Sequence, residues 1–97
     1  MNPIHLRPLA EQDLTNIWLY SYQNWGEAQA DQYFDQLSNA IELLGSAPLM
    51  SHIRQEFTPP VRIHHHGSHL IIYVATEDNV EIIRVLHESM DIEAMLE

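Results

Sequence analysis

Residues 61–86 read VRIHHHGSHLIIYVATEDNVEIIRVL and hold three runs rich in β-branched side chains. Each run has the length of a strand, and turn-forming residues separate it from the next. Because both connections are short, neighbouring runs are expected to pair antiparallel as a meander. The predicted strands cover residues 61–66, 69–74 and 80–86.

The two connections set the expected register of these strands. Gly67-Ser68 is a two-residue turn of the kind that joins a β-hairpin, and Asp78-Asn79 is expected to act in the same way. The pairs that follow are His66 with His69, Ile63 with Ile72, Thr76 with Glu81, and Tyr73 with Arg84.

Alternation along the paired strands sorts their side chains onto two faces. One predicted face is nearly all apolar, as a sheet packed on helices requires, and comprises Val61, Ile63, His65, Leu70, Ile72, Val74, Ile83 and Val85. The opposite face is predicted to stay uncovered and to carry Arg62, Tyr73 and Arg84 in one row. Its other members are His64, His66, His69, Ile71 and Ile82.

The N-terminal half of the chain reads as a short strand, residues 4–7, followed by two helices. Apolar side chains recur every three to four residues over about 9–25 and again over 27–44, with Gly26 between the two segments. The helices should therefore form an antiparallel hairpin that ends near Gly45. The first helix is expected to bury a largely aromatic face: Leu14, Ile17, Trp18, Ser21, Tyr22 and Trp25.

These elements predict an α+β fold of two layers, strand-helix-helix followed by a three-stranded antiparallel meander. A linker, residues 46–58, joins the halves, and residues 89–97 are expected to form a short helix or tail. The 97 residues make one domain, 1–97, of 11.3 kDa. The chain has no cysteine, which excludes a disulfide scaffold and a thiol nucleophile.

The charge balance bears on the class of partner. Fourteen Asp and Glu residues face four Arg and no Lys, for a formal net charge of −10. Nucleic-acid affinity comes largely from neutralising phosphates, so direct binding to DNA or RNA is not expected, whereas a basic protein partner is. The chain opens without the pattern of a signal peptide and has no long apolar run. We therefore expect a cytoplasmic protein that does not contact a membrane.

Ordered short motifs along nearly the whole chain resemble the ParE branch of the RelE/ParE toxin family. They are Pro8-Leu9-Ala10, Asp13-Leu14, Ile17, Trp25-Gly26, Gln29-Ala30, Tyr33, the Arg62 strand, His69-Leu70-Ile71-Ile72-Tyr73, Ile82-Ile83-Arg84-Val85-Leu86-His87 and Met90-Asp91. The resemblance implies the toxin of a type II toxin–antitoxin pair, held inactive by a ParD-like antitoxin. It further implies poisoning of DNA gyrase, growth inhibition and plasmid stabilisation.

Two alternatives stay open beside gyrase poisoning. The RelE-like branch cleaves messenger RNA on the ribosome, which requires a general base, a general acid and positive charge at the phosphate. The acidic surface disfavours an RNA-walled site, so a non-enzymatic gyrase inhibitor is preferred. A degenerate toxin that only binds its antitoxin is the other alternative, since Glu88-Ser89-Met90-Asp91 stands where relatives often carry Arg.

The resemblance and the predicted face together yield candidate site residues, none of them assigned as catalytic. The candidate target-binding surface is Arg62, Tyr73, Arg84, His87 and Met90, and the candidate antitoxin-binding surface is Ile71, Tyr73, Ile82, Arg62 and Arg84. Both arginines could instead stack on Tyr73 or pair with acidic residues. No cofactor or metal is expected, although His64, His66 and His69 offer a weak metal-binding possibility.

Overall fold

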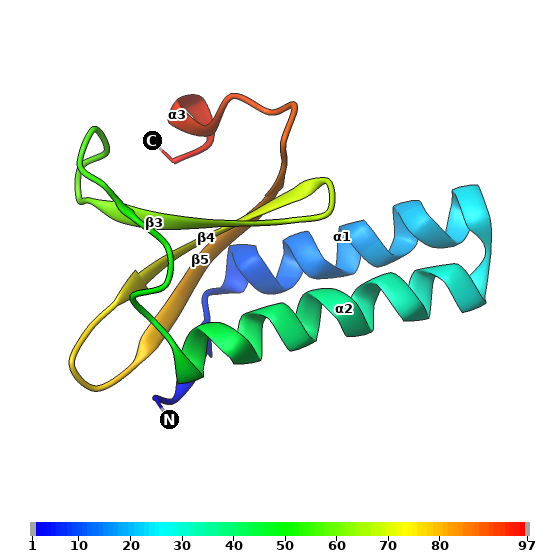
Figure 1. Cartoon of the computed structure of the whole chain (residues 1–97). Coiled ribbons are helices and arrows are strands. Elements are labelled where there is room, and N and C mark those ends of the chain that lie inside the picture. The colour runs from blue at the N-terminus through cyan, green and yellow to red at the C-terminus, as the bar shows by residue number, and fades with distance from the viewer. Residues whose placement is uncertain (1, 97) are drawn as a thin grey trace.

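The structure, a computed structural model, describes residues 2–96 and has the predicted α+β architecture (Figure 1). A five-stranded sheet has the order β1-β5-β4-β3-β2, in which β1 runs parallel to β5 and all other neighbours are antiparallel. The elements in chain order are β1 (Ile4–Leu6), α1 (Pro8–Trp25), α2 (Glu27–Ser46), β2 (Ile53–Arg54), β3 (Val61–His66), β4 (His69–Ala75), β5 (Val80–His87) and α3 (Ile92–Met95).

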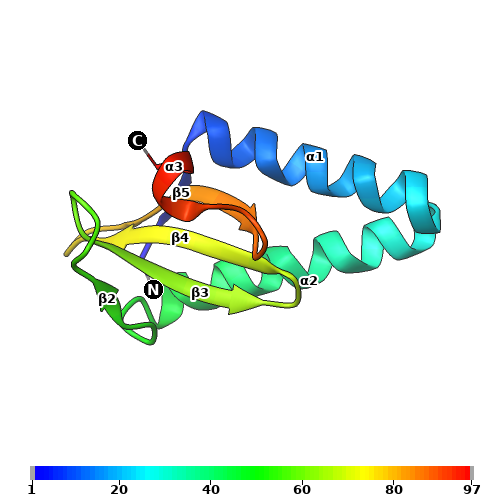
Figure 2. The same cartoon turned by 90° about the horizontal axis from the view of Figure 1, so that it is seen from above.

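The two long helices form the predicted hairpin. Gly26 joins them with φ +90°, a positive value that residues with a Cβ rarely adopt. Its N–H donates to the Tyr22 carbonyl. The hairpin packs on one face of the sheet, and its far end projects beyond the strands (Figures 1 and 2). Over residues 2–96, neither long helix is apolar enough along its length to span a membrane.

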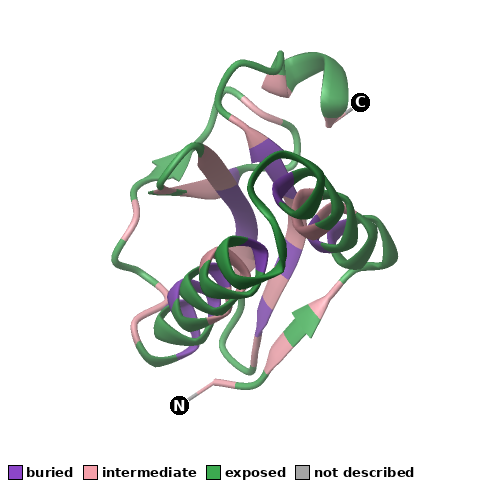
Figure 3. Cartoon of the chain, turned by 90° about the vertical axis from the view of Figure 1, so that its right-hand side faces the viewer, coloured by how far each residue is buried: buried purple, intermediate pink, exposed green. Residues whose placement is uncertain are grey.

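The main core lies between the hairpin and the sheet (Figure 3). The apolar stripe of α2 predicted from the sequence is confirmed, because it meets the side chains that β4 and β5 direct toward the helices. Burying each such side chain stabilises the fold by about 1.5–3 kcal/mol. The central members are Leu14, Leu37, Ile41, Leu44, Ile71, Tyr73, Val80, Ile82 and Val85.

A second apolar cluster covers the other face of the sheet. It is centred on Val61, Ile72 and Leu86, which are each at most 4% exposed. The C-terminal segment supplies Ile92 and Leu96 as its cover, and α3 lies on the side of the sheet away from the hairpin (Figure 1). Other partly buried members are Phe57, Ile63, Val74 and Ile83. The sheet is thus covered on both faces along β3 to β5.

The predicted assignment of sheet faces is wrong over β3, β4 and the start of β5, where the structure inverts it; Val85, in contrast, lies in the helix-facing core as predicted. Ile71, Tyr73 and Ile82 face the helices, whereas Ile72 and Ile83 belong to the opposite cluster. Both faces of β4 and β5 are apolar, as in sheets buried on two sides, so alternation alone did not identify the helix-facing set.

The register between β4 and β5 also differs from the prediction. Residues 76–79 form the connection, with the Thr76 N–H donating to the Asn79 carbonyl, so Tyr73 lies opposite Ile82 instead of Arg84. A β-bulge then leaves Ile83 without a partner in the ladder and places Arg84 opposite Ile72. The β3–β4 hairpin, in contrast, has the predicted pairs His66 with His69 and Ile63 with Ile72.

The predicted aromatic core of α1 is only partly present. Leu14 and Ser21 are buried, but Tyr22 is 48% exposed and Trp25 is 64% exposed. The reason is that the sheet ends before the hairpin does, so the last turn of α1 has only α2 to pack against.

Candidate functional site

The predicted row of Arg62, Tyr73 and Arg84 does not form an uncovered surface. Tyr73 is fully buried under the helical layer, and its hydroxyl donates to the Pro48 carbonyl at 2.9 Å. Arg62 lies beside Tyr73 as predicted, and its Nη1 donates to the Ser51 carbonyl at 2.6 Å. These two side chains therefore hold the segment that follows α2 against the sheet.

Arg84 is held by an acidic residue of α1. Its Nε donates to Asp13 Oδ2 at 2.7 Å and its Nη2 donates to Oδ1 at 2.9 Å, a two-pronged ion pair whose side chains are only 14% and 12% exposed. This hydrogen bonding raises the pKa of Arg84. The reading in which an arginine pairs with an acidic residue is confirmed for Arg84.

Asp13 was not among the predicted site residues, although the sequence held a signal for it. The residue lies three positions after Ala10 and four before Ile17, on the stripe of α1 that faces the core. A carboxylate on an apolar stripe needs a buried cation or N–H donors, and Asp13 receives both, since the Val85 N–H also donates to it at 3.0 Å.

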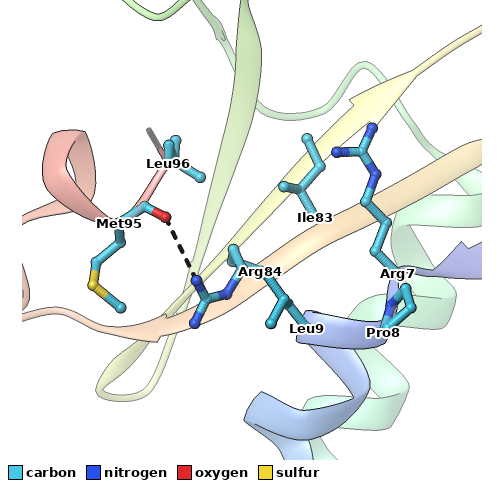
Figure 4. A pocket seen from close by; sticks show the side chains of 7 residues that line it. All are labelled: Arg7, Pro8, Leu9, Ile83, Arg84, Met95 and Leu96. Carbon is cyan, nitrogen blue, oxygen red and sulfur yellow. Dashed lines mark hydrogen bonds between the residues drawn. The ribbon is translucent and has the colours of Figure 1, made fainter.

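A groove opens beside Arg84, between the start of α1, β5 and the C-terminal segment (Figure 4). It has a volume of about 320 Å³, and the Arg84 Nη1 donates to the Met95 carbonyl at its edge. A second hollow of about 360 Å³ adjoins it and shares Arg7, Ile83 and Leu96. The lining residues of the first are Arg7, Pro8, Leu9, Ile83, Arg84, Met95 and Leu96.

The prediction that Ile71, Tyr73 and Ile82 form an accessible surface for the antitoxin is wrong. All three are fully buried in the main core, where they contact the helices. The accessible apolar side chains on this flank of the molecule are instead Leu9 of α1 and Met95 of α3, which are 54% and 38% exposed.

His87 is the last residue of β5 and pairs with His69 at the end of the sheet, and Met90 follows in the turn after this strand. Met90 is 46% exposed. The Nδ1 of His87 lies 2.7 Å from the Ser89 hydroxyl and accepts the Ser89 N–H, which fixes the ring over the turn that follows β5. Of the predicted target-binding residues, Met90 alone among those described here is largely exposed.

Three histidines share one row across the sheet, but they are not the predicted three. His69 pairs with His66 on one side and with His87 on the other, whereas His64 lies apart and its Nδ1 is 3.3 Å from the Ser51 hydroxyl. His65, which was predicted on the apolar face packed against the helices, is exposed, and its Nε2 lies 2.9 Å from Glu88. Within residues 2–96, no three His, Asp or Glu side chains are grouped so that they could hold a metal ion.

His69 lies in the middle of this row and is half-buried. Burial, followed by the neighbouring His87, lowers its pKa to about 4. Its Nδ1 shares a 2.6 Å hydrogen bond with the Tyr33 hydroxyl of α2, so the ring links the tip of the β3–β4 hairpin to the helical layer. Gly67 in that turn has φ +56°, and a Cβ there would lie 2.9 Å from the same hydroxyl.

Comparisons with known proteins agree with this fold and chain length. A family model described as "ParE toxin of type II toxin-antitoxin system, parDE" matches residues 4–92. Toxin ParE1 of Caulobacter vibrioides is 40% identical over 96 residues, which is 99% of each chain. Toxin ParE1 of Mycobacterium tuberculosis is 36% identical over 92 residues, which is 94% of each chain.

A solved structure has the same fold. It is described as the chromosomal ParDE TA system from P. aeruginosa, and the similarity has a TM-score of 0.76 at 16% sequence identity, covering 90% of this chain and 96% of that chain. The family model and the two relatives assign the chain to a family as well as to a fold. The chain belongs to the ParE toxin family of type II toxin–antitoxin systems, within the RelE/ParE superfamily.

Proposed function

We propose that this toxin is neutralised by a ParD-like antitoxin and that, when free in the cytoplasm, it poisons DNA gyrase by binding it and not by catalysis. One observation supports the second part of the proposal: the arginine and tyrosine side chains on the sheet that could serve a nuclease are buried or already bound to other groups of this chain. Tyr73 is buried, Arg62 binds a backbone carbonyl, and Arg84 is paired with Asp13.

Cleavage of RNA through its 2′-hydroxyl requires accessible proton carriers and positive charge around the phosphate. In this chain the guanidinium of Arg84 is already neutralised by a carboxylate, and the formal net charge of −10 repels an RNA-walled site. A protein target makes neither demand. The occupied arginines and the acidic surface therefore support gyrase over the ribosome as the target.

The groove beside Arg84 is the proposed place for the antitoxin. It is lined by the apolar side chains of Leu9, Ile83 and Met95. Its two arginines are already paired, Arg7 with Glu81 and Arg84 with Asp13. Antitoxin tails that fold on binding bury apolar side chains to offset their ordering cost. A segment rich in apolar residues matches this lining, which supports a ParD-like tail seated between α1, β5 and α3.

The proposal is tested by expressing the chain in cells with and without the antitoxin encoded beside it. Gyrase poisoning predicts filamentous cells with damaged DNA, and rescue by the antitoxin. Intact DNA with transcripts cut at ribosome-bound codons would instead identify a nuclease. The substitution Arg84→Met with Asp13→Leu serves as a control: it removes the arginine while leaving no buried charge, and toxicity should survive it.

A degenerate toxin is the second candidate, and the acidic residues after β5 favour it. His87 and Met90, the remaining candidates for the target-binding surface, stand beside Glu88 and Asp91, both exposed. Tight binding of the antitoxin without any effect of the free chain on growth would support this reading.

A further inference from the structure

The far end of the helical hairpin carries several exposed aromatic side chains that belong to neither apolar core cluster. Every residue from 22 to 29 is exposed, and within or next to this span Tyr20, Tyr22 and Trp25 are 61%, 48% and 64% exposed. We call these three side chains the hairpin tip. Figures 1 and 2 show that the end of the helical hairpin from which they come projects beyond the sheet, and the groove beside Arg84 lies at the opposite end of α1.

The rings of the hairpin tip are ordered by one another and by α2. Tyr20 and Trp25 meet edge to face with centroids 5.9 Å apart, and Tyr22 stacks on Trp18 at 5.2 Å. The Trp18 Nε1 in turn donates to Asp31 Oδ1 at 2.8 Å. Rings held in this way lose little conformational freedom on binding, and exposed Trp and Tyr are the side chains most enriched at interface hot spots.

The charge of the hairpin indicates the kind of surface that would meet these rings. Residues 8–46 contain no Arg, Lys or His but six carboxylates, of which only Asp13 has an arginine partner. The six are Glu11, Asp13, Glu27, Asp31, Asp35 and Glu42. Guanidinium and ammonium groups are attracted both to such carboxylates and to the faces of Trp and Tyr. Two copies of this hairpin would repel each other instead.

We infer that the hairpin tip docks on an arginine- or lysine-bearing surface of the toxin's protein target. This inference rests on the proposed function, in which that target is DNA gyrase. The tip and the groove beside Arg84 are then separate surfaces, one for the target and one for the antitoxin. Because α1 joins them along its 18 residues, an antitoxin bound in the groove need not contact the aromatic rings.

The first test measures binding of purified DNA gyrase to the toxin by biolayer interferometry. The double variant Tyr20→Ala with Trp25→Ala should bind at least about tenfold more weakly than the unaltered chain. Leu49→Ala, which truncates an apolar side chain 70% exposed after α2, should leave the affinity unchanged. Antitoxin binding should be retained by both variants, which shows that they fold. Equal gyrase affinity of the double variant and the unaltered chain would overturn the inference.

The second test separates charge at the tip from net charge. Glu27→Lys and Glu77→Lys change the net charge equally, but Glu27 opens α2 beside the tip and Glu77 lies in the exposed β4–β5 connection. Glu27→Lys should weaken gyrase binding severalfold more than Glu77→Lys does. Equal effects of the two substitutions would contradict a basic surface opposite the tip.

Growth arrest distinguishes failure of this inference from failure of the proposed function. If the unaltered chain arrests growth without binding gyrase, the gyrase proposal fails. The role of the hairpin tip is then tested by comparing growth arrest by the double variant with arrest by the unaltered chain. Loss of arrest in the double variant, with antitoxin binding intact, would then support the inference for another target. Full arrest by the double variant, or none by the unaltered chain, would overturn it.

Discussion

Asp13 in α1 and Arg84 in β5 form a two-pronged ion pair at 2.7 and 2.9 Å, and the Asp13 carboxylate also accepts the Val85 N–H. The pair joins the first helix to the strand next to the bulge. Both side chains are nearly buried, so removing one leaves the other's charge without a partner in a site of low solvent access.

Asp13→Ala should therefore lower the free energy of unfolding by about 3 kcal/mol, measured by urea denaturation. The double variant Asp13→Leu with Arg84→Met should recover much of this loss, because no unpaired charge is left. A loss below about 1 kcal/mol in Asp13→Ala would mean that the pair behaves like an exposed one.

Tyr73→Phe removes a single hydroxyl from the core. The Pro48 carbonyl would lose its 2.9 Å donor while the ring keeps its packing, so we expect a loss of about 1 kcal/mol in the free energy of unfolding. Tyr20→Phe, which removes a hydroxyl from an exposed ring, is the matched control and should leave stability unchanged. Equal stability of Tyr73→Phe and the unaltered chain would speak against this hydrogen bond.

His69 should make the stability of the fold depend on pH. Its pKa is about 4 in the folded chain against an ordinary 6.5, so between these values the unfolded chain binds more protons. The free energy of unfolding should fall as pH falls through this window. The groups facing the ring are Tyr33, His66, His87 and Glu88.

Thermal melts over this pH window, compared between His69→Gln and the unaltered chain, test the effect. The variant should lose part of the decline in melting temperature toward acid pH. His52→Gln, which changes an exposed histidine outside the row, should keep the full decline. Parallel profiles for all three proteins would rule out a contribution from His69.

The parts of the fold that local residues encode could be predicted from the sequence. Gly67-Ser68 allows only a tight turn, so the β3–β4 register followed from it, and Gly26 separated the two helices for the same kind of reason. The sequence could not show which face of the sheet packs against the helices, because Ile71 and Ile72 are consecutive and both apolar. Strand alternation distinguishes two faces only when one of them is polar.

The site depended on contacts between distant parts of the chain, and there the prediction failed. The bulge at Ile83 shifts the register of the rest of β5 by one residue, and no local pattern in residues 80–87 indicates it. The partner of Arg84 lies 71 residues away in α1. The C-terminal cover by Ile92 and Leu96 was likewise hidden in a segment predicted only as a short helix or tail.

Binding of the operator of the toxin–antitoxin pair should require the antitoxin. The formal net charge of −10 disfavours contact with DNA phosphates, so the purified toxin alone should give no mobility shift of operator DNA. The complex with a ParD-like antitoxin should shift it. A shift by the toxin alone would contradict the division of roles proposed for the pair.

Incubation of the purified toxin with DNA gyrase, supercoiled plasmid and ATP tests the proposed target most directly. We expect protein-linked, cleaved plasmid to accumulate with the toxin and to disappear when the antitoxin is added first. Plasmid that stays uncleaved, together with messenger RNA cut in a translating ribosome mixture, would contradict gyrase poisoning and identify a nuclease.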